Sequence, residues 1–72
     1  DEKFMFGIIR ASFNQRRKTL QNGLANDSRL GVDKEQVAEA LRQMGLKETI
    51  RGETLSLAQF AEFSNILGSI RL

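Results

Sequence analysis

Residues 13–24, FNQRRKTLQNGL, divide the chain into an apolar part before them and a mixed part after them. Leu20 and Leu24, four positions apart, begin a new apolar seam inside this stretch. Asn14 is of a residue type that caps helices, because its side-chain oxygen accepts an orphan backbone N–H. We therefore expect one helix to end just before Asn14 and a second to run over residues 15–25. The first turn of that second helix would contain three consecutive cations, Arg16, Arg17 and Lys18.

Upstream, residues 2–13 carry apolar side chains that cover more than half of a helix circumference. They are Phe4, Met5, Phe6, Ile8, Ile9 and Phe13. A helix this apolar packs on two sides. It is either the central helix of this chain or a helix with one side against a domain outside it. Core packing is the expected role of Phe13, Phe60 and Phe63, whereas Phe4 and Phe6 could contact another domain.

Downstream, two sequence patterns that mark the beginning of a helix have the same form. Asp33 and Gln36 stand in capping-box register before an apolar helical pattern, and Ser56 and Gln59 repeat that register. Gly45 follows the first of these patterns, where a helix commonly ends. The chain has no proline, and its apolar spacing is helical throughout. We expect an all-α fold, a small bundle of about four helices at residues 2–13, 15–25, 34–44 and 57–69, forming one domain over residues 1–72.

The composition excludes most kinds of catalytic, metal-binding and nucleotide-binding site. The chain has no His and no Cys, and none of its six glycines forms a G-x-G pattern. Glu35 and Glu39 stand on a polar helix face and are expected to be solvated. We therefore expect no catalytic residue, no metal and no cofactor in this chain. No apolar run reaches the roughly 20 residues that span a bilayer, so we expect no membrane contact. The charged start without Met suggests a fragment of a longer cytoplasmic protein.

Net charge is only +2, but its distribution is uneven. No acidic residue occurs between Lys3 and Asn26, and cations dominate that segment. Three cations in the first turn of a helix oppose its dipole, and a bound phosphate would relieve this mismatch. The alternative is an ordinary ion pair with a carboxylate such as Glu53. We favour anion binding, and the predicted phosphate contacts are Arg10, Arg16, Arg17, Lys18 and Arg51.

The same stretch is similar to the C-terminal domain of the KsgA family of ribosomal RNA adenine dimethyltransferases. The similarity begins at residues 6–13 and includes the segment Phe-x-x-Arg-Arg-Lys-Thr-Leu at 13–20. It continues through Gly45, the segment Arg-x-Glu-x-Leu-Ser at 51–56 and the last helix. It therefore covers essentially the whole chain, although none of these segments is a catalytic motif.

The resemblance implies a fold and a function. Family members carry an N-terminal methyltransferase domain that binds S-adenosylmethionine and dimethylates two adjacent adenines in the 3′-terminal hairpin of small-subunit rRNA. Their helical domain helps to dock the enzyme on the assembling small ribosomal subunit. This implies that the catalytic domain and its cofactor lie outside this chain, and that its partners are small-subunit rRNA and its own N-terminal domain.

Two other functions stay open at this point. One is a helix-turn-helix DNA-binding domain, suggested by the pattern at residues 37–41 followed by Gly45. Its recognition helix would be residues 57–70, which carry Glu62 and no cation. The other is a protein–protein adaptor that uses the exposed side of the first helix.

Overall fold

The computed structural model describes residues 2–71, and within them the fold is all-α, as the sequence predicts. Four α-helices and one short 3-10 turn follow one another along the chain, with no strand among the described residues. They are α1 (Glu2–Asn14), α2 (Leu20–Ala25), α3 (Lys34–Gln43), η1 (Gly52–Thr54) and α4 (Leu57–Arg71).

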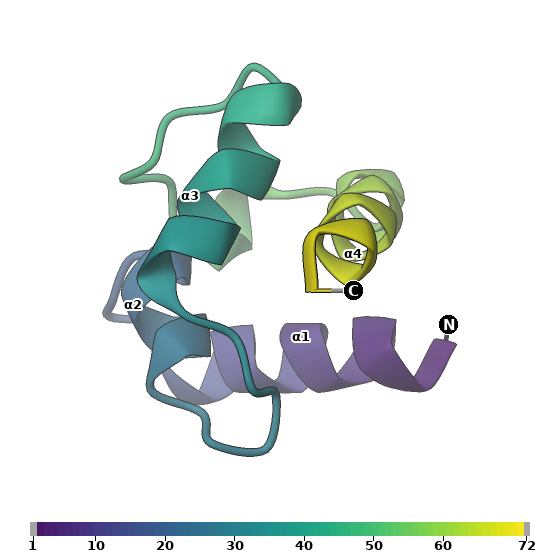
Figure 1. Cartoon of the computed structure of the whole chain (residues 1–72). Coiled ribbons are helices and arrows are strands. Elements are labelled where there is room, and N and C mark those ends of the chain that lie inside the picture. Colours follow the sequence, from purple (N-terminus) through teal and green to yellow (C-terminus); the bar gives the residue numbers. More distant parts are fainter. Residues whose placement is uncertain (1, 72) are drawn as a thin grey trace.

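The helices close around one core. In Figure 1, α1 runs along the lower edge, α3 rises at the left, and α4 is seen nearly end-on above the beginning of α1. Contacts join α1 to α2, α2 to α3, α3 to α4, and α4 back to α1, so the bundle is a closed ring of four helices. Its largest fully buried side chains are Phe63, Ile8, Leu20, Leu24, Leu41, Leu67 and Val37.

Local signals set both ends of α3. The Asp33 carboxylate accepts the Gln36 N–H at 2.8 Å, and the Gln36 side chain accepts the Asp33 N–H at 3.1 Å. At the other end Gly45 has φ +74°, a conformation that glycine adopts without strain. This conformation lets the Leu46 N–H donate to the Leu41 carbonyl at 2.9 Å. The predicted capping box and the predicted terminal glycine are both confirmed.

The start of α4 repeats this arrangement. The Ser56 hydroxyl accepts the Gln59 N–H at 3.1 Å, and the Gln59 side chain accepts the Ser56 N–H at 2.8 Å. Two orphan backbone donors are thereby satisfied by neighbouring side chains alone, without help from tertiary contacts. This predicted helix start is also confirmed.

The start of α2 differs from the prediction. Asn14 does not cap it, because the Gln15 N–H still donates to the Ala11 carbonyl at 3.1 Å and α1 continues through Asn14. The cap is Thr19, whose hydroxyl accepts the Asn22 N–H at 3.2 Å. The helix therefore begins at Leu20, and residues 15–18 form a turn and bend between the two helices.

The prediction that Phe13 packs in the core is wrong, whereas the core positions of Phe60 and Phe63 are confirmed. The Phe13 side chain is 69% exposed and that of Phe6 is 53% exposed. The buried residues of α1 are Ile8, Ala11 and Ser12. One further residue turns a helix by about 100°, which places Phe13 outside this buried arc.

Candidate nucleic-acid interface

Arg16, Arg17 and Lys18, called here the basic loop, lie between α1 and α2, and all three are exposed. The loop is held at its base by backbone hydrogen bonds. The Lys18 N–H donates to the Gln15 carbonyl at 2.9 Å, which closes the turn after α1. Thr19 then adopts an extended conformation and caps α2. The backbone is therefore fixed at both ends of the basic loop, while its side chains project from the surface.

The predicted dipole mismatch is wrong, because the basic loop precedes the cap of α2 instead of forming its first turn. The loop instead follows the last residues of α1, where unsatisfied carbonyls carry partial negative charge. Cations at that end of a helix are favourable. The dipole of α2 therefore does not favour an anion at the basic loop, and any anion site there depends on the exposure of the cations and on their lack of acidic partners among the described residues.

Tertiary contacts bring Arg51 to the same region. The Leu20 N–H donates to the Ile50 carbonyl at 2.8 Å, which ties the start of α2 to the residue just before Arg51. The residue after Arg51, Gly52, is buried and packs closely against Ser12 of α1. A Cβ added to Gly52 would lie only 3.0 Å from the Ser12 Cβ. The Arg51 side chain is exposed. The basic loop and Arg51 together form what we call the basic edge.

The cations of the basic edge lack acidic partners. Within residues 2–71, none of the four lies within 4.0 Å of a carboxylate oxygen. The alternative that Glu53 pairs with the loop is not realised. Arg16 and Glu53 line one hollow together with Phe13 and Phe60 but do not form an ion pair. The basic edge therefore presents positive charge that the described part of the chain does not neutralise.

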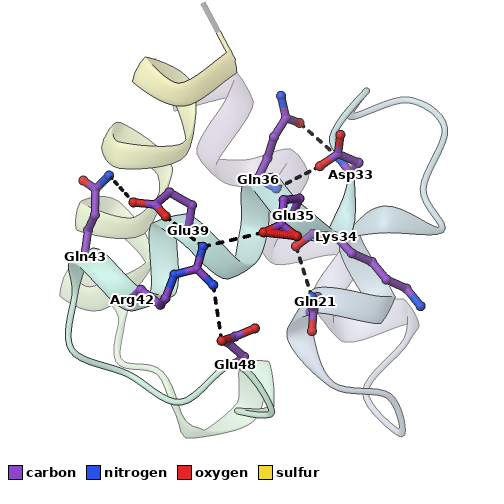
Figure 2. A network of polar contacts seen from close by, with 9 residues as sticks. All are labelled: Gln21, Asp33, Lys34, Glu35, Gln36, Glu39, Arg42, Gln43 and Glu48. Carbon is purple, nitrogen blue, oxygen red and sulfur yellow. Dashed lines mark hydrogen bonds and ion pairs between the residues drawn. The ribbon is translucent and has the colours of Figure 1, made fainter.

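Arg42 on α3 shows the opposite arrangement (Figure 2). Its guanidinium lies 2.8 Å from a Glu39 oxygen, 3.3 Å from Glu48 and 3.7 Å from Glu35. The Gln43 amide donates to the second Glu39 oxygen at 3.1 Å. The Arg42 guanidinium is thus engaged by carboxylates of the chain itself. The basic edge differs in that it gathers four cations, three of them consecutive, without such partners among residues 2–71, and it is therefore the candidate interface.

The Arg42 cluster yields a prediction about pH. The hydrogen bond from the Arg42 guanidinium, and then the one from Gln43, lower the pKa of Glu39 below its ordinary value of 4.5. A lowered folded-state pKa means that this pair stabilises the fold above about pH 4.5 and that its contribution is lost as the pH falls through the lowered pKa. We expect Arg42→Gln to raise the Glu39 pKa toward 4.5 in a carboxyl-detected NMR titration. An unchanged pKa in the variant would contradict this assignment.

Arg10 does not join the basic edge, contrary to the grouping predicted from the sequence. It stands two positions before Ser12, which packs against Gly52, and so it points about 200° away around α1. There it lines a separate hollow together with Lys3, Arg29 and Arg71. The sequence does not indicate that Arg29 and Arg71 accompany Arg10, because they lie 19 and 61 positions further along the chain.

The geometry also bears on the other candidate functions. A helix-turn-helix joins its helices by about 3–4 residues, whereas residues 44–56 separate α3 from α4. The DNA-binding alternative therefore lacks its defining geometry.

Within residues 2–71 no group of three or more His, Cys, Asp or Glu side chains could hold a metal ion. No helix among the same residues is long and apolar enough to cross a membrane.

No protein-family model matches the chain. Curated relatives do match it, and they share one name, ribosomal RNA small subunit methyltransferase A. The protein from Lachnoclostridium phytofermentans is 51% identical over 67 residues, which are 93% of this chain and 23% of that protein. Those from Halothermothrix orenii and Bacillus cytotoxicus are 49% and 50% identical, again over 93% of this chain and over 22% and 23% of their own lengths.

These matches confirm the resemblance to rRNA-modifying methyltransferases. More particularly, the chain corresponds to the C-terminal region of the ribosomal RNA small subunit methyltransferase A type. It spans less than a quarter of the length of the curated relatives that it matches.

Proposed function

We propose that this chain is an RNA-docking domain that holds a larger methyltransferase on small-subunit rRNA of the assembling ribosomal subunit. One observation carries the proposal: the four cations of the basic edge are exposed and have no carboxylate within 4.0 Å among residues 2–71. Arginine forks and lysine ammonium groups bind phosphate oxygens strongly. The name that the relatives share, ribosomal RNA small subunit methyltransferase A, supports ribosomal RNA as that polyanion.

The proposal extends to the whole protein. We assign to it the S-adenosylmethionine-dependent dimethylation of two adjacent adenines in the 3′-terminal hairpin of small-subunit rRNA, in the cytoplasm. Residues 2–71 do not fit that cofactor, since they contain neither a strand nor a glycine-rich turn leading from a strand into a helix. We therefore assign cofactor binding and catalysis to a proposed N-terminal domain outside this chain. The exposed Phe6 and Phe13 rings offer that domain an apolar contact.

The decisive experiment removes the basic loop. We expect Arg16→Ala/Arg17→Ala/Lys18→Ala to weaken binding to a fluorescently labelled fragment of small-subunit rRNA. The slope of log K against log salt should become shallower by about two to three units, because each phosphate contact contributes roughly 0.7 to 0.9. Fold retention is checked by circular dichroism, since all three side chains are exposed.

The control is Lys34→Ala/Lys47→Ala, which removes two exposed cations from and beside α3 and should change the slope little. If the loop variant binds rRNA as tightly as the parent chain, the docking proposal is wrong. Salt-independent binding to a protein partner would instead support the adaptor function.

A further inference from the structure

A second group of cations surrounds a hollow on the other side of α1 from Ser12. The hollow has a volume of about 290 Å³ and lies between α1, the loop after α2 and the end of α4. Its charged lining consists of Lys3, Arg10, Arg29, Arg71 and Asp27. Among the described residues that line the hollow, four cations from three separate segments stand beside one carboxylate.

That carboxylate is already engaged. The Asp27 oxygens accept the Arg29 Nε and Nη2, each at 3.2 Å, and one of them also accepts the Arg29 backbone N–H at 3.0 Å. Hydrogen bonding from Arg29 holds the pKa of Asp27 below its ordinary value, so the group stays ionised at neutral pH. Asp27 therefore orients the Arg29 side chain on the wall of the hollow, and the Asp27 oxygens make their hydrogen bonds with Arg29. Arg10 adds to the lowering of the Asp27 pKa through its charge, but neither Arg10 nor Arg71 forms an ion pair within residues 2–71.

The apolar part of the lining restricts which part of a nucleic acid could enter. The Arg71 guanidinium lies 4.6 Å from the centroid of the Phe4 ring and covers its face. A base could not stack on that face without displacing Arg71. The hollow is therefore suited to an anionic group held by guanidinium forks, and not to a base read by stacking.

Its position relates the hollow to the basic edge. Arg10 lies on α1 four residues before its last residue, Asn14, and the basic loop follows the end of that helix. A ligand with charges repeated along its length could reach both sites, whereas an isolated carboxylate could occupy only one.

We propose that the hollow lined by Arg10, Arg29 and Arg71 is a second phosphate-binding site, which takes a backbone phosphate of the same RNA that the basic edge binds. This inference rests on the proposed function. Because this site would contact only the phosphate backbone of the RNA, its affinity would not depend on the base sequence. It would therefore increase the affinity of the domain for RNA without increasing its sequence specificity.

The test compares two pairs of substitutions that remove the same charge. We expect Arg10→Gln/Arg71→Gln to weaken binding of the rRNA fragment about tenfold at low salt and to make the salt slope shallower by one to two units. The loss should be equal for a scrambled RNA of the same length. Lys34→Gln/Lys47→Gln, on and beside α3, should change neither quantity appreciably. Arg10→Gln alone serves as a second variant if the loss of Arg71 frays α4.

The outcomes separate this proposal from the proposed function. If the basic-loop variant loses binding while Arg10→Gln/Arg71→Gln keeps the parent affinity and slope, the second site is wrong and the docking function stands. If neither variant loses binding, both proposals fail. Sequence-dependent loss, or equal displacement of RNA by polyglutamate at matched charge, would assign the hollow to another ligand and overturn the phosphate proposal.

Discussion

Phe63→Ala should leave most of the chain unfolded at room temperature. The Phe63 side chain is 0% exposed and is the largest of the fully buried side chains of the bundle. Truncating a buried phenylalanine to alanine costs about 3 to 5 kcal/mol, through lost burial and the cavity that remains. A single core in a domain of this size supplies only about 3 to 5 kcal/mol of net stability. The stability lost in Phe63→Ala is therefore comparable to the whole net stability of the domain. Urea titration followed by circular dichroism should show a variant that is largely unfolded before urea is added.

Phe13→Ala is the matched control, because it makes the same chemical change at a ring that is 69% exposed. We expect its free energy of unfolding to stay within about 0.5 kcal/mol of the parent value. Equal destabilisation by the two substitutions would show that Phe13 is buried in solution, against the fold described above. Phe13→Ala thus tests which face of α1 points to the core, with Phe63→Ala as the reference for a buried ring.

Gly52→Ala is the second substitution with a large expected effect on stability. The backbone of Gly52 does not have positive φ, so alanine introduces no backbone strain there. The cost is steric: a Cβ at this position overlaps the Ser12 hydroxyl oxygen and lies 3.0 Å from Ser12 Cβ. Overpacking of this kind costs about 1 to 3 kcal/mol. We expect that loss in urea unfolding, together with displacement of η1 from α1.

A double-mutant cycle identifies the cause. Ser12→Ala removes the overlapping hydroxyl, so Ser12→Ala/Gly52→Ala should recover part of the stability lost in Gly52→Ala. Recovery is expected to be incomplete, because the two Cβ atoms would still lie 3.0 Å apart. Additive effects of the two substitutions would mean that the Ser12 contact is not the source of the loss.

Close packing at Gly52 also has a functional consequence. Arg51 directly precedes Gly52, and its other neighbour, Ile50, is hydrogen-bonded to Leu20. The backbone of Arg51 is therefore held between two tertiary contacts, one to α1 and one to α2. Under the proposed function, this packing fixes Arg51 beside the basic loop, so that both present their charges along one edge.

Several features follow from the sequence alone because they depend on residues three to five positions apart. The capping boxes at Asp33 and Ser56 and the glycine that ends α3 involve only neighbouring side chains and backbone groups. Such local hydrogen bonds form in the same way wherever the helix packs. The all-α class and the family resemblance also came from the sequence, the latter through the basic segment at residues 13–20.

Other features needed the tertiary structure because their partners are distant in the chain. The Thr19 cap of α2 is local, but the bond that ties the start of α2 to the connector before η1 is not: the Leu20 N–H donates to the Ile50 carbonyl, thirty positions away, and no local pattern indicates that bond. The apolar residues of α1 cover too much of the helix for the sequence to choose its inner face, so only packing placed Ile8 inside and Phe13 outside. Packing likewise placed Arg10 with Arg29 and Arg71, because a helix face acquires its neighbours only when the bundle closes.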